Sequence, residues 1–315
     1  MVSYIRNMKL VLLIAFLGIV TTILNPTTTL QGATTGLNTW LYGLVPTLLP
    51  FIIVSNFILS KEISQLLFSV LPKTMHPHYR KVCIAFNIIA GFTFGLPVGA
   101  KITSTLLKNQ CIDRKEGQIL LNHCNTIGPS FVGGFFLTKC LHKSQWLPLT
   151  FAILYLPQLC GVLLCLKRHK SQIKSPLVHE KIKISRLRNC FQILDISIVN
   201  GFETIVVLGG YLILFGILCA YMARIPIVPH TAKSYLIAVL EITSGTKALS
   251  CLPIPAAFKL ALTLPLITLG GLCTLMQTKS VTKGCPLSMR KYLLHKGIYA
   301  LLTATIVSIG LFILY

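Results

Sequence analysis

Two glutamates in apolar surroundings are the residues of this chain best suited to chemistry inside a membrane. The chain has seven acidic residues, and Glu203 lies in NGFETIVVLGG while Glu241 follows the apolar run LIAVL. A carboxylate at membrane depth is costly, so it indicates a functional site by default. It could carry a coupling proton, hold Na⁺ or accept hydrogen bonds from a hydroxylated ligand. The structural alternative is that Glu203 faces the lipid headgroups and that Glu241 pairs with Lys247.

Two segments broken by glycine and proline interrupt otherwise apolar sequence, one in each half of the chain. They read GFTFGLPVGAK at 91–101 and EITSGTK at 241–247. Lipid cannot satisfy the backbone groups of an irregular segment, so such a segment lies against protein or lines a polar cavity. A matched pair of breaks predicts the binding site of a transporter. The residues expected to bind a ligand or to let the backbone approach it are Gly95, Pro97, Gly99, Lys101, Gly245 and Lys247. Lys101 has an alternative place at the cytoplasmic headgroups.

A third polar cluster is HCNTIGPSF at 123–131, where a Gly-Pro pair breaks the apolar run. Asn122, Asn125 and Ser130 offer donors and acceptors at this depth. The asparagine amides suit a base-like or amide-bearing ligand, although they could instead bond neighbouring helices to one another. No nucleophile with a base and an orienting group occurs, and neither CxxC nor HExxH occurs. The sequence therefore predicts neither an enzyme nor a metal site.

The composition of the chain indicates that the segments carrying these residues lie in a membrane. The chain is 54% hydrophobic and 11% charged, with a mean hydropathy of +0.75, whereas soluble domains carry about 25% charged residues. The net charge of +22 comes mostly from short segments between apolar runs. These basic residues indicate membrane topology and contacts with anionic headgroups, and we expect no nucleic-acid partner.

The distribution of lysine and arginine predicts how the chain crosses the bilayer. If 82–107 and 234–257 each enter the membrane and return, the basic segments 61–81, 101–115 and 279–296 all face the cytoplasm, as the positive-inside rule requires. The second half is then the first half turned upside down. We predict an all-α polytopic membrane protein with two inverted-topology repeats, each containing a re-entrant hairpin. The expected segments are an N-terminal transmembrane helix (1–30), a first repeat (31–166), a basic cytoplasmic linker (167–190) and a second repeat (191–315).

The order of these motifs resembles that of the YlbJ-type sporulation integral membrane proteins. The motifs that carry the resemblance are PTLLPF at 46–51, GLPVGAK at 95–101, CNTIGPSF at 124–131, GFET at 201–204 and EITSGTK at 241–247. That family is grouped with proteins that contain the nucleoside-recognition (Gate) domain. The family's aromatic residue between Gly95 and Pro97 is Leu96 here. The resemblance implies a role in forming heat-resistant spores, through the spore cortex, and the Gate relatives imply re-entrant hairpins and a nucleoside-like solute.

We therefore expect a multi-pass protein of the cell membrane, or of the forespore membrane, that moves a small polar solute coupled to H⁺ or Na⁺. The solute site would lie between the hairpin tips and would include Glu203, Glu241, Asn125 and the 95–101 loop. The alternative is a non-transporting scaffold for spore envelope assembly that recruits partners through the basic linker. Apart from the coupling ion no cofactor is expected, and the expected partners are the lipid bilayer, sporulation proteins or further copies of the chain.

Overall fold

The computed structural model describes residues 18, 20–70, 78–169 and 190–314, and this part of the chain is helical without any strand. Within these residues, five helical segments are long and apolar enough to cross a membrane: Pro26–Ile58, Ser144–Arg168, Cys190–Arg224, Ala256–Val281 and Met289–Phe312. The predicted class of all-α multi-pass membrane protein is confirmed. The first 17 residues and most of the predicted linker (170–189) lie outside the described residues.

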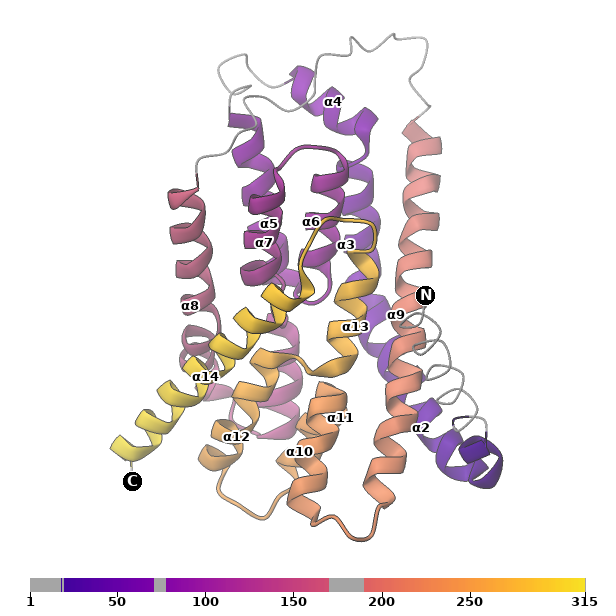
Figure 1. Cartoon of the computed structure of the whole chain (residues 1–315), viewed down its shortest axis with the longest axis vertical. Helices are drawn as coiled ribbons and strands as arrows, with labels where there is room; N and C mark the ends of the chain where they lie inside the picture. Colours follow the sequence, from indigo (N-terminus) through magenta and orange to yellow (C-terminus); the bar gives the residue numbers. More distant parts are fainter. Residues whose placement is uncertain (1–17, 19, 71–77, 170–189, 315) are drawn as a thin grey trace, which may run out of the picture.

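The first half consists of a long helix, a helical hairpin, an interrupted helix and a second long helix (Figure 1). The long helix is formed by α2 (Pro26–Asn38), η1 (Thr39–Leu44) and α3 (Val45–Ile58), and α4 (Lys61–Val70) follows it. The hairpin consists of α5 (Tyr79–Phe94) and α6 (Val98–Lys108). The interrupted helix consists of α7 (Arg114–Cys124) and η3 (Ser130–Cys140). The short η4 (Ser144–Trp146) then leads into the second long helix, α8 (Leu147–Arg168).

The same order of elements occurs in the second half. The long helix is α9 (Cys190–Arg224), and the hairpin consists of α10 (His230–Leu240) and α11 (Ile242–Ser250). The interrupted helix consists of α12 (Ala256–Leu269) and α13 (Gly271–Val281), and the last helix is α14 (Met289–Leu314). In Figure 1 the α5–α6 hairpin occupies the upper half of the molecule and the α10–α11 hairpin the lower half.

The arms of both hairpins are short. Helix α6 has 11 residues and α11 has nine, which correspond to about 16 Å and about 14 Å at 1.5 Å per residue. Both lengths are below the roughly 30 Å thickness of a bilayer core. The two arms of each hairpin pack against each other. Each predicted break lies between two short helices that pack against each other, at Gly95–Pro97 between α5 and α6 and at Glu241 between α10 and α11.

Several basic segments meet at one end of the molecule. Arg114 Nε donates to the carbonyl oxygen of Pro286 over 2.8 Å, and His169 Nε2 lies 2.8 Å from Asp113 Oδ2. The loop before α7, the end of α8 and the loop before α14 are thus neighbours. The topology argument placed these segments on a common side, and the contacts bring them together.

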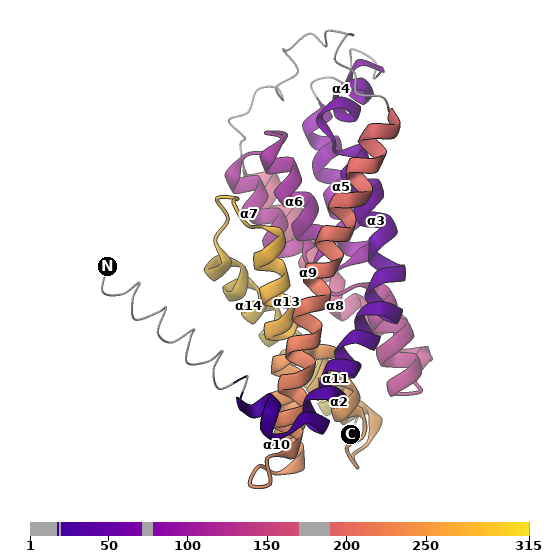
Figure 2. The same ribbon diagram turned by 90° about the vertical axis from the view of Figure 1, so that its right-hand side faces the viewer.

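Helix α2 was not anticipated, because no separate helix was expected between the predicted N-terminal transmembrane helix (1–30) and the first helix of the repeat that follows it. Its threonine- and glycine-rich sequence is only weakly hydrophobic, but small residues let helices approach closely in a membrane. Gly32 and Gly36 face α9 at Gly216, and a Cβ on Gly32 would lie 2.6 Å from the Cα of Ile217. Figure 2 shows α2 lying across the lower part of α9. The predicted segment boundary at residue 30 falls inside α2.

We expect Gly36→Leu to separate α2 from α9, because its side chain would overlap the backbone of α9 at Leu212 and Ile213. Overpacking of this kind costs about 1–3 kcal/mol. Thermal unfolding of the purified protein should show a lower midpoint. Gly210→Leu is the control, since no atom lies within 4 Å of a Cβ built there. Equal midpoints for the two variants would show that the glycine contact contributes no stability.

Candidate functional site

A cavity of about 380 Å³ lies where the two halves meet, and we call it the central cavity. Its walls come from η1, from the tips of both hairpins, from the start of η3 and from α13. Representative lining residues are Tyr42, Leu96, Ser130, Glu241, Thr243 and Gln277. Ligand sites of small molecules have volumes of this order.

Glu241 is the acidic residue of the central cavity, and its local structure holds it in place. It ends α10 and caps α11, and its side chain is only 4% exposed. Its two carboxylate oxygens accept the backbone N–H groups of Thr243 over 2.8 Å and of Ser244 over 2.7 Å. A negative charge is favourable at a helix N-terminus. A carboxylate has about four acceptor sites, so Glu241 retains capacity to bind a donor in the cavity.

The tip of the first hairpin approaches the break between α7 and η3. Gly95 has a φ of +76°, and a Cβ there would overlap the backbone of Gly128. Gly99 packs in the same way against the backbone of Cys124. Leu96, between the predicted glycine and proline, lines the central cavity, and Pro97 precedes α6 as its N-cap. Glycine at these positions is thus required by close packing of two backbones.

Asn125 lies outside the cavity lining and joins several elements. It is fully buried, and its Oδ1 accepts the N–H of Ala100 over 3.2 Å. Its Nδ2 donates to Thr278 Oγ1 and to the Tyr292 hydroxyl, each over 3.0 Å. We call this set of bonds the Asn125 joint, and it connects α6, the α7 break, α13 and α14. Asn122 accepts a bond from Gln118 within α7. Of the predicted polar cluster, Ser130 reaches the central cavity.

Lys101 and Glu203 line a second cavity, of about 350 Å³, at the end of the molecule that holds α4. Its other polar residues include Asn56, Lys61, Lys108 and Asn200. On α9, the lining of this cavity ends at Thr204, whereas the residue that lines the central cavity is Leu212. Between them Ile205 and Leu208 are buried, as is Ile52 on α3. The structure therefore separates Glu203 and Lys101 from Glu241 by packed apolar side chains.

A third cavity, of about 530 Å³, was not anticipated, and we call it the basic cavity. It is lined by Lys139, Lys247 and Lys259 together with His142, and none of its described lining residues is acidic. It shares Phe135 and Lys139 with the central cavity. In the topology predicted from the sequence, these lysines belong to the side of the membrane where the positive-inside rule expects few basic residues. Their convergence on one cavity depends on the packing of η3, α11 and α12. Gly245 lies beneath this region, against Ala238 of α10.

The chain is similar to a sporulation membrane protein. Over 213 residues it is 26% identical to the sporulation integral membrane protein YlbJ of Bacillus subtilis (strain 168). The match covers 62% of this chain and 52% of that protein, so the chain spans about half the length of the curated relative it matches. No family model and no solved structure matches the chain. Together with the five apolar helical segments of the described residues, the similarity to an integral membrane protein supports a multi-pass membrane protein.

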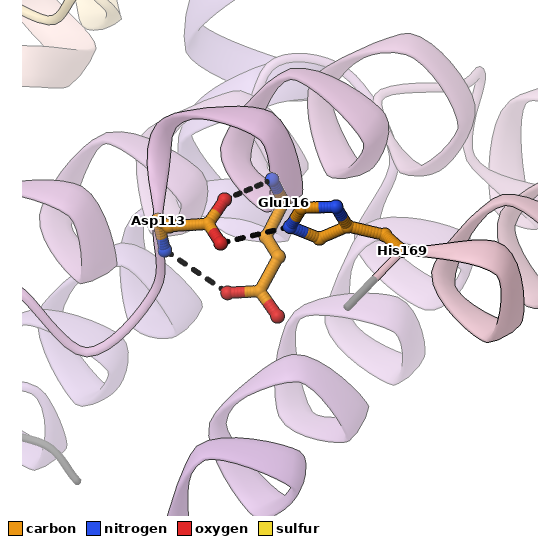
Figure 3. Close-up of side chains that lie close together, drawn as sticks. All are labelled: Asp113, Glu116 and His169. Carbon is orange, nitrogen blue, oxygen red and sulfur yellow. Dashed lines mark hydrogen bonds and ion pairs between the residues drawn. The ribbon is translucent and has the colours of Figure 1, made fainter. Parts of the chain in front are cut away.

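Asp113, Glu116 and His169 form a cluster of possible metal ligands at the end of the molecule opposite the basic cavity (Figure 3). The cluster has a structural explanation. Asp113 and Glu116 form a capping box at the start of α7, with reciprocal side chain–backbone bonds of 2.8 and 3.0 Å. Glu116 also pairs with Arg80 of α5. The cluster fastens α5, α7 and the end of α8, and the guanidinium of Arg80 balances the charge of Glu116.

Proposed function

We propose that the protein is a sporulation transporter that moves a small, negatively charged polar solute through the central cavity. The observation that carries this proposal is that the central cavity, with Glu241 at a hairpin tip, shares a wall with a cavity lined by three lysines. Lysine-lined pores and clefts attract anions and raise their local concentration. A carboxylate- or phosphate-bearing solute fits this arrangement, including a nucleoside-like one.

The proposed architecture is a pair of inverted repeats whose hairpins are re-entrant. The recurrence of the element order, the shortness of the hairpin arms and the placement of the two hairpins in opposite halves of Figure 1 support it. In this arrangement the N-terminus, the linker and the basic segments around Lys101 face the cytoplasm. The fold would then be of the Gate type, and transport would serve spore cortex formation.

The proposed mechanism is alternating access. The central cavity adjoins the basic cavity on one side, and Ile52, Ile205 and Leu208 separate it from the Lys101–Glu203 cavity on the other. Movement of a hairpin tip would open this apolar layer, which would let the solute leave toward Lys101. Transport would be coupled to H⁺ or Na⁺, without a chemical reaction.

Uptake into proteoliposomes tests this proposal. The labelled probes are uridine, uridine monophosphate, succinate and orthophosphate, which separate charge from size. We expect the wild-type protein to take up at least one anionic probe and to prefer uridine monophosphate to uridine. The variant Lys139→Gln/Lys247→Gln/Lys259→Gln should reduce anion uptake about tenfold or more.

The matched control is Lys143→Gln/Arg224→Gln/Lys233→Gln, which removes three positive charges from residues that do not line the basic cavity. Added salt should weaken the effect of the cavity lysines, because screening acts on exposed charges. Equal uptake by both triple variants, or absence of uptake of all four probes by the wild type, would contradict the proposal.

A further inference from the structure

Lys296 of α14 is buried in the interior without a hydrogen-bond partner among the described residues. It is 1% exposed, and its Nζ has no hydrogen-bond acceptor among the described residues. The ring of Tyr292, one turn earlier, has its centroid 5.7 Å from this nitrogen. Lysines near membranes usually extend to the headgroups, and an ionisable group at membrane depth without a partner indicates a function.

Among the described residues, no carboxylate contacts Lys296. From α7, His123 packs edge-on against His295 with ring centroids 5.5 Å apart, and its Nδ1 lies 2.7 Å from the Tyr299 hydroxyl. Helix α12, which packs along α14, contributes the Thr268 hydroxyl, bonded to Thr303. The titratable groups of this region in the described chain are His123, Cys124, Cys160, Cys165, Tyr292, His295 and Tyr299.

A short path connects Lys296 to the tip of the first hairpin. Tyr292 stands beside Lys296, and its hydroxyl is held by Asn125 Nδ2 over 3.0 Å. Asn125 in turn accepts the N–H of Ala100, in the first turn of α6. The side chain next to the buried amine is thus a member of the Asn125 joint.

We propose that Lys296 is a proton-binding site whose charged form loosens the Asn125 joint and releases the first hairpin. The amine takes up one proton and becomes an ammonium, which brings three N–H donors. Because its Nζ has no hydrogen-bond partner among the described residues, the ammonium competes with Asn125 for the Tyr292 hydroxyl or draws water into the interior. This proposal rests on the proposed transport function, because release of the first hairpin would open the central cavity to the solute.

Two substitutions imitate the uncharged and the charged form of Lys296. Lys296→Met is uncharged at every pH, and Lys296→Arg is charged at every working pH. Lys291→Met is the matched control, because Lys291 is an exposed lysine of the same helix. The readout is modification of Cys124 by N-ethylmaleimide, followed by site-resolved mass spectrometry on protein in lipid nanodiscs. Cys124 is fully buried and adjoins Asn125, so its reaction reports opening of the joint.

We expect Cys124 of the wild type, normalised to exposed Cys251, to react faster at about pH 7 than at about pH 9. Lys296→Met should react slowly at both pH values, and Lys296→Arg about tenfold faster at both. Lys291→Met should follow the wild type. The proposal is overturned if all four proteins give the same normalised rates.

A second measurement covers the case in which Lys296→Arg does not fold. The thermal midpoint of Lys296→Met should exceed that of the wild type at about pH 7, and the difference should shrink at about pH 9. A midpoint at or below that of the wild type at both pH values would make Lys296 a structural residue. Neither measurement involves transport, so their failure is distinct from failure of the uptake experiment.

Discussion

Replacing Glu241 by glutamine is expected to stop transport and to reduce the yield of heat-resistant spores. The amide keeps the shape of the side chain, but it has a single acceptor oxygen in place of two. One of the N–H groups of Thr243 and Ser244 then loses its partner, and the negative charge at the start of α11 is lost. We expect the free energy of unfolding to fall by about 1–2 kcal/mol. Uptake of the preferred anionic probe should fall about tenfold or more, because the tip of the α10–α11 hairpin is no longer fixed in the central cavity.

Asp195→Asn is the matched control for this substitution, since Asp195 is an exposed acidic residue of α9 that lines none of the three cavities. It should sporulate and transport like the wild type. Wild-type uptake by Glu241→Gln, together with an unchanged spore yield, would remove Glu241 from the mechanism.

Gly95→Ala is expected to be the most damaging single change in the first hairpin. The residue has a φ of +76°, where a side chain costs about 1–2 kcal/mol. The added Cβ would also overlap the backbone of Gly128, which cannot move without displacing the start of η3. We therefore expect a loss of more than about 2 kcal/mol of stability and an altered central cavity.

Gly297→Ala provides the comparison, because no atom lies within 4 Å of a Cβ at this position of α14. Its thermal midpoint should equal that of the wild type or exceed it slightly, since alanine favours helix. If Gly95→Ala unfolds at the same temperature as Gly297→Ala, the contact between the hairpin tip and the α7 break does not hold the fold together.

The sequence predicted the helical class and the two places where a helix is interrupted, because these depend on local signals. Glycine, proline and the lengths of apolar runs are enough to place a break near Pro97 and another within 241–247. Helix α2 was missed, since its stability comes from the contact of Gly32 and Gly36 with α9 and hydropathy does not register such contacts.

The partition of the polar residues among three cavities could not be predicted. Glu203 and Glu241 look alike in sequence, but the position of α9 places one beside Lys101 and the fold of the second hairpin places the other in the central cavity. A membrane helix is apolar on most faces, so periodicity does not reveal which face is buried in protein. Lys296 likewise resembles the basic residues of the loop that precedes it, and its burial follows from the packing of α14 against α7 and α12.

Access to the central cavity from both sides of the membrane is the central claim, and Ser130→Cys tests it most directly. Ser130 lines the cavity, and replacing its hydroxyl by a thiol is a small change. The measurement is modification of this cysteine by a membrane-impermeant maleimide in right-side-out and inside-out vesicles, resolved by mass spectrometry. Our account predicts modification from both sides, with protection by the preferred anionic probe. Modification from one side alone, unaffected by any probe, would contradict transport and would favour a membrane scaffold.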